Sequence, residues 1–390
     1  MFLRKLQLTS FRNFESLCID LSQNVNIFLG KNGTGKTSIL EAISMLSLPK
    51  SFRTNNINEL IMFDWDYFRV TGEFVERKED GEGVGVDVGG DSRTLEVGYQ
   101  IEPRKHRSLK INDVKKTTKE FLQGAYVVTF VPQDLYLIDL GPSKRRNYLN
   151  RVLSKLDFMY LDNLSRYEKT MKERNAVLRR IFEGFSDRSE LSPWDQQLVQ
   201  TGSFLIKRRL EFLKKMSHSM KKYYAEIADS KDKVEIYYAS KLHDIVGKES
   251  LLSTPFEVEE IEQDFENALA ARTDRDIATK STSVGPHRDD LRFFLNEKDL
   301  EHFASRGEKR TLLLALKVGE LEIVKKHIGT TPLLLLDDVF SELDNDRQTQ
   351  LLHLISEYQT FITTNSPEHF ENFDQEKAVW EVVGNDIRSV

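Results

Sequence analysis

The chain has 390 residues, of which 39% are hydrophobic and 30% are charged, as in a globular protein with a large polar surface. This length exceeds what one simple core usually needs, so we expect more than one structural unit. The net charge of -6 excludes a protein that is basic over its whole surface, so any nucleic-acid binding must use a local patch. No apolar run approaches the roughly 20 residues of a membrane helix, and we expect a soluble, cytoplasmic protein without a secretory signal.

The first part of the chain predicts short strands that lead into a glycine-rich loop and a helix. Alternating apolar residues predict strands at Leu3–Leu8, Leu17–Leu21 and Val25–Leu29, and helical spacing follows from Ser38 to Leu48. Within the second strand, Cys18 is expected to be a small buried residue rather than a reactive thiol. Strand, loop and helix in this order are what a phosphate-binding loop requires.

Further strands and then long helices are predicted in the middle of the chain. Strand-like segments run from Phe68 to Leu109, and the acidic, glycine-rich stretch Asp80–Asp91 predicts a solvated hairpin tip or loop. Helical spacing runs from Pro142 to about Phe185, and a second helix, capped by Ser192, reaches Ile227. We expect these helices to pack against each other; the alternative is an arm that grips a partner.

The loop after the third strand matches the phosphate-binding pattern G-x-x-x-x-G-K-[ST]. It comprises Gly30, Lys31, Asn32, Gly33, Thr34, Gly35, Lys36 and Thr37. The glycines let backbone N–H groups point at phosphate oxygens, at the positive end of the following helix. We expect Lys36 to reach the β- and γ-phosphates and the Thr37 hydroxyl to bind Mg²⁺. Because the Asn-Lys dipeptide typical of guanine recognition is absent from the chain, ATP is favoured over GTP.

An apolar strand near the C-terminus supplies two acidic residues. The buried run Leu333–Leu336 leads directly to Asp337 and Asp338. We expect Asp337, where the strand emerges at the carboxyl edge of the sheet, to be the metal-side carboxylate. Asp338 is then placed to orient or deprotonate the attacking water. Any buried strand ends in something polar, so it is the combination with the phosphate loop that makes these acids candidates for catalysis alongside Lys36.

Several further segments are similar to motifs of one protein family. They are Phe11–Phe14, Ser51–Thr54, Gly285–Asp290, Ala304–Arg310, and Leu336–Asp344, whose last residues resemble a D-loop. The serine and glycine of Ala304–Arg310 resemble the signature motif of ABC-type ATPases. With Asn32 and Gly33, the segment Phe11–Phe14 resembles the SMC and Rad50 branch of these ATPases. Over its whole length the chain resembles the RecF family of bacterial recombination and gap-repair proteins in this branch.

The resemblance implies an α/β fold. It would be an ABC-type P-loop ATPase head, with a mixed sheet and helices, that carries an inserted, mainly helical domain. The expected boundaries are residues 1–135 for the N-terminal part of the ATPase domain, which includes an antiparallel strand subdomain. Residues 136–280 would form the inserted helical domain, and residues 281–390 the C-terminal part of the ATPase domain.

The resemblance also implies a nucleotide site shared between two protomers. ATP and Mg²⁺ would be sandwiched in a head-to-tail homodimer, with Ser305 and Gly307 contacting the γ-phosphate held by Lys36 of the other copy. Arg12 and Asn13 are expected to contact the nucleotide. Gln133 stands where a Q-loop would sense metal and water, although a simple turn glutamine is an equally good interpretation.

Implied partners are duplex DNA beside single-strand gaps, RecR, RecO and RecA.

Three residues depart from the usual pattern. Asp338 stands where most transport ABC ATPases carry glutamate, and its shorter reach predicts a slow ATPase that works as a switch. With the family resemblance, we expect DNA to stimulate this ATPase. Glu308 stands where many signatures have glutamine. Thr364 or Asn365 occupies the place of the usual switch histidine.

Basic residues concentrated between positions 104 and 222 predict a DNA-binding surface. The candidates are Arg104, Lys105, Lys144, Arg145, Arg146, Lys207 and Arg208. Each cluster alone is more often a solvated face. Arg53 is interpreted equally as a phosphate contact or a surface salt bridge, and Gly285–Asp290 as a segment that orders the approach to the signature helix. The alternative functions are an SMC-like structural head and the energy subunit of a transporter.

Overall fold

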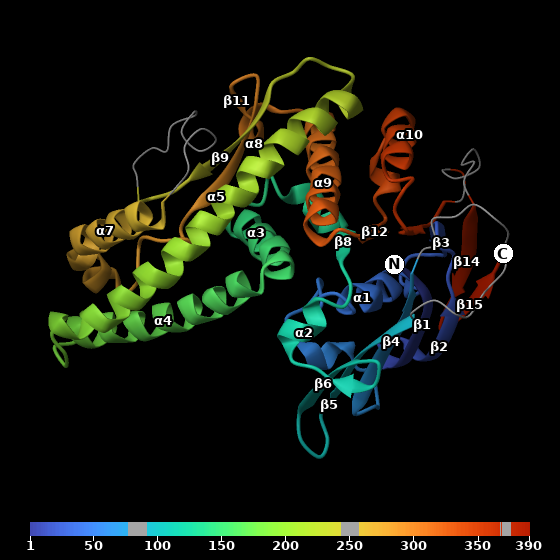
Figure 1. The fold of residues 1–390 in the computed structure, drawn as a ribbon, viewed down its shortest axis with the longest axis horizontal. Coiled ribbons are helices and arrows are strands. Elements are labelled where there is room, and N and C mark those ends of the chain that lie inside the picture. The colour runs from blue at the N-terminus through green and yellow to red at the C-terminus, as the bar shows by residue number, and fades with distance from the viewer. Residues whose placement is uncertain (77–91, 243–256, 367, 369–375) are drawn as a thin grey trace. The chain divides into compact units, whose positions relative to one another are not determined.

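The computed structural model describes residues 1–76, 92–242, 257–366, 368 and 376–390. The predicted loop Asp80–Asp91 lies outside these residues. The chain forms two compact units (Figure 1). Unit 1 comprises Met1–Asp134 and Glu320–Val390, and unit 2 comprises Leu135–Gly319.

The first sheet of unit 1 is antiparallel, with the strand order β2-β1-β4-β5-β6-β7. The strands are β1 (Phe2–Phe11), β2 (Phe14–Asp20), β4 (Tyr67–Val75), β5 (Ser92–Gln100), β6 (His106–Ile111) and β7 (Val114–Lys115). Cys18 is exposed, which corrects the expectation that it is buried. Because side chains alternate along a strand, the buried neighbours Leu17 and Ile19 leave Cys18 on the opposite, solvent face of β2.

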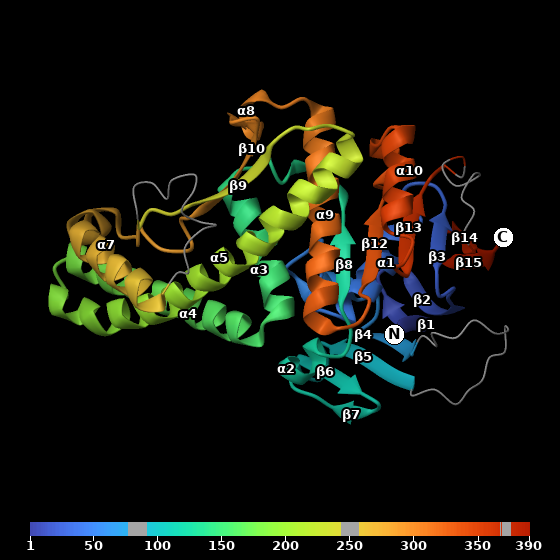
Figure 2. The same cartoon turned by 45° about the horizontal axis from the view of Figure 1, so that its top comes forward.

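The second sheet of unit 1 carries the order β15-β14-β3-β13-β12-β8 (Figure 2). Its strands are β3 (Val25–Leu29), β8 (Val127–Phe130), β12 (Leu333–Asp337), β13 (Thr360–Thr364), β14 (Lys377–Val383) and β15 (Asp386–Ser389). All neighbours are parallel except β14 and β15. Strands β8, β12 and β13 are buried throughout their length, as expected for a parallel sheet covered on both faces.

Helix α1 (Lys36–Met45) joins the two sheets into one core. It contacts β4 of the first sheet and β8, β12 and β13 of the second. Its apolar residues belong to the same buried cluster as residues of both sheets. Unit 1 also contains α2 (Thr118–Leu122), α10 (Asn345–Leu354) and the 3₁₀ turns η1 (Ile57–Leu60) and η4 (Phe340–Glu342).

Unit 2 is mainly helical. Its helices are α3 (Pro142–Leu156), α4 (Phe158–Phe182), α5 (Ser192–Ala228), α7 (Val258–Thr279) and α8 (Leu300–Phe303), with the 3₁₀ turn η3 (Arg188–Leu191). Helices α4 and α5 lie against each other (Figure 1). The predicted helix from Pro142 to Phe185 is in fact two helices, because the chain is extended at Asp157, whose side chain caps α4. Ser192, predicted as a cap, is the first residue of α5.

A small antiparallel sheet and the start of α9 complete unit 2. The sheet consists of β9 (Val234–Ala239), β10 (Asp290–Leu295) and β11 (Lys298–Asp299). Helix α9 (Arg306–Ile328) begins in unit 2 and ends in unit 1. The predicted boundary after residue 280 therefore differs from the unit boundary after Gly319. Residues 281–319 group with unit 2 because β10 pairs with β9, and because Arg145 of α3 forms an ion pair with Asp290.

Candidate nucleotide-binding site

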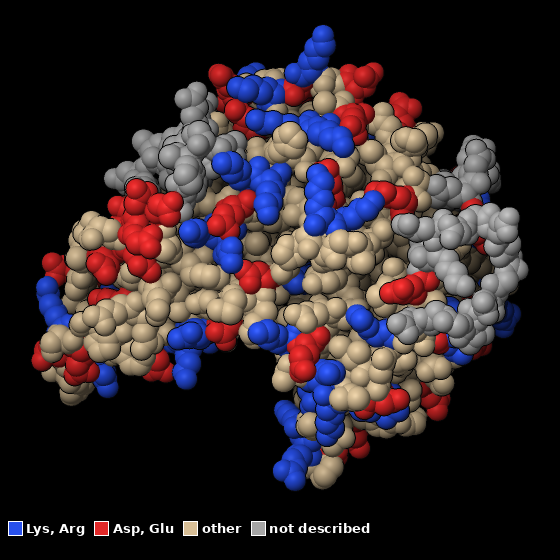
Figure 3. All heavy atoms as spheres, in the orientation of Figure 1, with Lys and Arg blue, Asp and Glu red and all other residues tan. Residues whose placement is uncertain are grey.

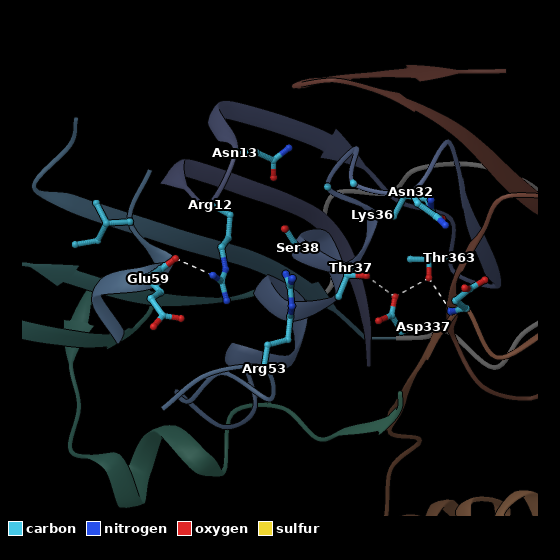
Figure 4. A pocket seen from close by; sticks show the side chains of 14 residues that line it. Arg12, Asn13, Asn32, Lys36, Thr37, Ser38, Arg53, Glu59, Asp337 and Thr363 are labelled. Atoms are coloured by element: carbon cyan, nitrogen blue, oxygen red, sulfur yellow. Dashed lines mark hydrogen bonds between the residues drawn. The ribbon is translucent and has the colours of Figure 1, made fainter. Parts of the chain in front are cut away.

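The carboxyl ends of adjacent parallel strands form a polar pocket in unit 1. Strands β3, β13 and β12 are neighbours, and Asp337 at the end of β12 pairs in register with Thr363 of β13. The phosphate loop follows β3 and lies beside both residues in a pocket of roughly 510 Å³ (Figure 4). The pocket is lined by Arg12, Asn13, Asn32, Gly33, Gly35, Lys36, Thr37, Ser38, Arg53, Glu59, Ile61, Asp337, Asp338 and Thr363.

Glycine is required at two positions of the phosphate loop. Gly35 has φ 104° and precedes α1, and a Cβ atom there would collide with the side-chain amide of Asn13. A Cβ atom on Gly30 would lie 2.5 Å from the carbonyl oxygen of Val382. Asn13 Nδ2 donates a hydrogen bond to the Thr34 carbonyl at 3.3 Å. Asn13 therefore supports the loop from the pocket wall, in addition to its predicted place beside the nucleotide.

Lys36 is buried at the start of α1, over the phosphate loop. Its Nζ donates hydrogen bonds to the carbonyl oxygens of Gly30 at 2.6 Å and Lys31 at 2.9 Å. Burial lowers the pKa of Lys36, and the charges of Asp338 and Asp337 oppose this shift. A cation held here lies beside the backbone amides of the loop, where phosphate oxygens are expected to bind.

Three hydroxyl and carboxyl groups connect α1 with β12 and β13 (Figure 4). Thr37 Oγ1 and Thr363 Oγ1 each donate a hydrogen bond of 2.8 Å to Asp337 Oδ1. Burial raises the pKa of Asp337, and the hydrogen bonds from the two threonines act in the opposite direction. The predicted pair Thr37 and Asp337 is thus brought together, although 300 positions separate the two residues.

These oxygens fit a magnesium ion. Mg²⁺ prefers hard oxygen ligands and usually keeps water and phosphate oxygens as well as one or two protein ligands. A threonine hydroxyl and a buried carboxylate in direct contact, at the first turn of α1, supply such a donor pair. Within the described part of the chain, no group of three or more His, Cys, Asp or Glu residues forms an alternative metal centre.

Asp338 lines the pocket in an unusual backbone conformation. Its φ is 51°, in the left-handed region that residues other than glycine seldom adopt. Among the described residues, its buried Oδ1 has no hydrogen-bond partner. Its backbone N–H donates to Thr363 Oγ1 at 2.9 Å. Strained backbone and an unsatisfied carboxyl oxygen are typical of functional sites, which agrees with a hydrolytic role for Asp338.

Arg12 is held by a carboxylate that the sequence analysis did not single out. Its guanidinium donates to both oxygens of the fully buried Glu41, at 2.8 and 2.7 Å, and to the carbonyl of Glu59 at 2.8 Å. Glu41 also accepts a short hydrogen bond from Ser51 and lies 3.6 Å from Arg53. Arg12 therefore shapes the pocket wall. Arg53 combines both predicted features, since it lines the pocket and faces Glu41.

The signature residues and Gln133 are not among the residues of this pocket. Ser305 and Gly307 belong to unit 2. The Ser305 hydroxyl and N–H both donate to Glu308, at 2.6 and 2.7 Å, and the Glu308 N–H returns to the Ser305 hydroxyl at 3.3 Å, which is a capping box. Gln133 lies in the 3₁₀ turn η2 (Pro132–Tyr136), and its side chain is outside the described residues.

Arg145, one of the predicted DNA contacts, cannot reach DNA because it is buried. It bonds to Asp290, Glu301 and the carbonyl of Ile138. Arg146 donates to the Asp289 carbonyl at 2.8 Å, and Arg208 forms ion pairs with Asp157 and Glu211. Arg104, Lys105 and Lys144 are exposed, and Lys207 is half-buried. On the face in Figure 3, basic and acidic side chains are interspersed rather than separated into one positive field.

The segment Gly285–Asp290 is part of a buried polar network in unit 2. His287 Nε2 lies 3.0 Å from the Thr282 carbonyl, so this nitrogen carries the hydrogen, and Nδ1 accepts from the Tyr167 hydroxyl at 2.7 Å. Burial lowers the pKa of His287 to about 4. The buried Arg209 donates to the Pro286 carbonyl at 2.7 Å. These contacts favour the interpretation that the segment orders the chain ahead of α9.

A phosphate loop between β3 and α1, with acids at the end of β12, defines a P-loop nucleotide-binding protein. A family model described as "RecF/RecN/SMC N terminal domain" matches residues 2–386. The "DNA replication and repair protein RecF" of Streptococcus gordonii is 35% identical over 391 residues, with full coverage of both chains. That of Lachnoclostridium phytofermentans is 35% identical and covers 95% of each. The chain belongs to the RecF family.

Solved structures agree with this assignment. One described as "the recombination mediator protein RecF-ATPrS in RecFOR pathway" has a TM-score of 0.86 at 33% identity, and the match covers 100% of this chain and 98% of that one. A second, with RecF-ATP, has a TM-score of 0.85 at 32% identity, covering 100% and 97%. An Smc head domain from Pyrococcus furiosus has a TM-score of 0.53 at 16% identity, covering 100% and 96%, and supports the fold alone.

Proposed function

We propose that the chain is an ATP-dependent recombination mediator that dimerises on DNA and is released by slow ATP hydrolysis. The observation that carries this proposal is the hydrogen-bonded group of Thr37, Asp337, Thr363 and Asp338 beside the phosphate loop. Full-length similarity to RecF structures with ATP and an ATP analogue supports it. In the described residues, no helix has the length and apolarity of a membrane span. Because the proposed partner is DNA, we place the protein's work in the cytoplasm.

The chain's own residues would divide the work as follows. Backbone amides of the loop and Lys36 would bind the phosphates. Thr37 and Asp337 would hold Mg²⁺, which would supply positive charge beside the phosphoryl group. Asp338 accepts the proton of the attacking water. The side chain of Asp338 is shorter than that of a glutamate, which favours slow turnover. We infer that DNA binding raises the rate of hydrolysis. Gln133, in η2, would act as the Q-loop glutamine that contacts the metal and the water.

Hydrolysis would require a second copy of the chain. Ser305 directly precedes α9 and Gly307 lies in its first turn, at the N-terminal end that favours anions. In the proposed dimer they complete the site of the other protomer by contacting the γ-phosphate. ATP binding would close the dimer on duplex DNA beside a single-strand gap, where RecR, RecO and RecA would act. Release from DNA would follow hydrolysis, because the contact of Ser305 and Gly307 with the γ-phosphate is lost when the phosphate leaves.

Sizing in solution tests the proposal. The wild-type chain is sized with ATP, with ADP and without nucleotide, each with and without gapped duplex DNA. We expect a dimer with ATP alone and a longer-lived one on DNA. Lys36→Met should abolish ATP-dependent dimers, whereas Lys31→Met, at an exposed loop lysine, should retain them. Asp338→Asn should bind ATP and dissociate more slowly. A wild-type chain that stays monomeric with ATP on DNA would refute the proposal.

A further inference from the structure

Thr363 occupies a position between the two acids that no sequence motif marks. It is 1% exposed and lies near the end of β13, between β3 and β12 in the sheet. Its hydroxyl contacts Asp337 Oδ1 at 2.8 Å and the backbone N–H of Asp338 at 2.9 Å. We propose that Thr363 is a positioning residue that fixes the hydrolytic Asp338 relative to the metal-binding Asp337. This inference rests on the proposed function.

The direction of the hydrogen bonds makes this link specific. A backbone N–H can only donate and an ionised carboxylate can only accept. The Thr363 hydroxyl therefore accepts from Asp338 and gives its single hydrogen to Asp337. Such a chain of bonds, in which each polarises the next, is stronger than its separate members in a buried setting. A methyl group in place of this hydroxyl would break both bonds at once.

The backbone of Asp338 depends on this contact. Its left-handed φ of 51° is unfavourable for a residue with a side chain and must be held by its surroundings. Thr363 binds the Asp338 N–H through its hydroxyl and also through its carbonyl at 3.2 Å. On the other side, the Ser341 hydroxyl donates to the Asp338 carbonyl at 2.8 Å. The peptide groups flanking Asp338 are thus fixed from both directions.

The carboxylate itself has no such support. Asp338 Oδ1 is buried without a hydrogen-bond partner among the described residues. No hydrogen bond to this oxygen fixes the direction of the carboxylate, so its aim depends on how the backbone of Asp338 is held. Because Thr363 holds that backbone, removing the hydroxyl should disturb the aim of Asp338 while leaving the phosphate loop in place. The effect should therefore fall on turnover more than on nucleotide binding.

Thr360 of the same strand offers a matched control. It is also fully buried, and its hydroxyl donates to the Tyr358 carbonyl at 3.1 Å. Thr360 pairs in register with Val25, at the opposite end of β3 from the phosphate loop. Thr360→Val thus removes a buried hydroxyl from β13 without touching the acids. Any general cost of the Thr-to-Val change in this strand should appear equally in both variants.

The experiment compares Thr363→Val, Thr363→Ser and Thr360→Val in the full-length chain at saturating Mg²⁺. We expect Thr363→Val to lower kcat about 10- to 100-fold, as for loss of a supporting contact behind a metal site, with KM for ATP changed less than about threefold. Thr363→Ser, which keeps the hydroxyl, should restore most of the rate. Hydrogen exchange measured on peptides that contain Asp338, without nucleotide, should be faster in Thr363→Val alone.

The outcomes separate this inference from the proposed function. If the wild type hydrolyses ATP and Thr363→Val matches Thr360→Val in kcat and in exchange at Asp338, the positioning role is refuted while the proposed function stands. Equal loss in Thr363→Val and Thr363→Ser refutes it too, because the hydroxyl would not be the cause. A wild type that hydrolyses no ATP, with or without DNA, would refute both.

Discussion

Ser305 donates its hydroxyl hydrogen to Glu308 of the same chain at 2.6 Å, and its N–H donates to the same carboxylate oxygen at 2.7 Å. The Ser305 donors proposed to meet the γ-phosphate of a second protomer are therefore already engaged within their own protomer. The incoming phosphate must displace the Glu308 carboxylate, which belongs to the helix that Ser305 directly precedes. The negative charge of Glu308 would also oppose the incoming phosphate.

We predict from this contact that Glu308→Gln strengthens ATP-dependent dimers. Glutamine keeps a capping side chain but removes the competing charge. The dimer dissociation constant with ATP should fall about three- to tenfold, an effect of roughly 1 kcal/mol, as measured by sizing at graded protein concentrations. Glu322→Gln, further along α9, is the control and should leave the constant unchanged. A weaker dimer in Glu308→Gln would contradict the prediction.

Glu41 should be a major determinant of stability in unit 1. It is fully buried and binds the Arg12 guanidinium through both oxygens. Glu41→Gln leaves this arginine without its counter-charge, and we expect a loss of about 3 kcal/mol in the free energy of unfolding. Urea titration measures this loss. Glu73→Gln, which affects the more exposed pair with Arg4, should cost less than about 1 kcal/mol. Equal effects of the two changes would argue against the assigned role of Glu41.

His287 predicts a pH-dependent stability. Burial lowers its folded pKa to about 4 from the ordinary value of 6.5, so the folded state binds fewer protons than the unfolded state between these values. The stabilising effect is complete above pH 6.5 and is lost as the pH falls towards 4, by about 2 kcal/mol at pH 5. Urea midpoints at pH 5.0 and 7.5 should differ less in His287→Gln than in wild type. The exposed His302 provides the control, since His302→Gln should keep the wild-type difference.

The basic residues should divide into DNA contacts and structural residues. Replacing the exposed Arg104 and Lys105 by alanine should weaken duplex binding and reduce the slope of log affinity against log salt by up to about 2, one for each lost phosphate contact. Arg145→Ala should instead destabilise the fold by about 3 kcal/mol, because Asp290 and Glu301 lose their buried partner. Fluorescence anisotropy across salt concentrations and urea titration distinguish the two effects. An unchanged salt slope would remove the Arg104 region from the DNA surface.

The contiguous parts of the site could be predicted from sequence. The loop Gly30–Thr37 is a local pattern whose glycines answer local backbone needs. The acids at the end of β12 could be found because an apolar strand followed by polar residues marks the carboxyl edge of a parallel sheet. That Thr37 and Asp337 meet follows from strand pairing, and the hydrogen bond between them is present.

Residues whose role depends on distant partners could not be predicted in this way. Arg12 lines the pocket, where a nucleotide contact stays a prediction, but the binding of its guanidinium by Glu41 of α1 could not be seen in the sequence. Arg145 was part of a basic run, yet it is buried against residues of β10 and α8. Thr363 gave no signal, because threonine is common in β-strands and β13 contains two others. The available hint for Glu41 was that it is the one acid in α1, between Leu40 and Ala42.

The insertion of unit 2 between the two parts of unit 1 has a consequence for biosynthesis. The phosphate loop leaves the ribosome early. Strands β12 and β13, which the second sheet needs on one side of β3, follow some 300 residues later. At ordinary elongation rates this is a delay of about 15 to 60 seconds. Throughout that interval β3 has neither β13 nor β14 beside it. A truncated or stalled chain therefore carries the loop but lacks the acids, and it cannot hydrolyse ATP by the proposed mechanism.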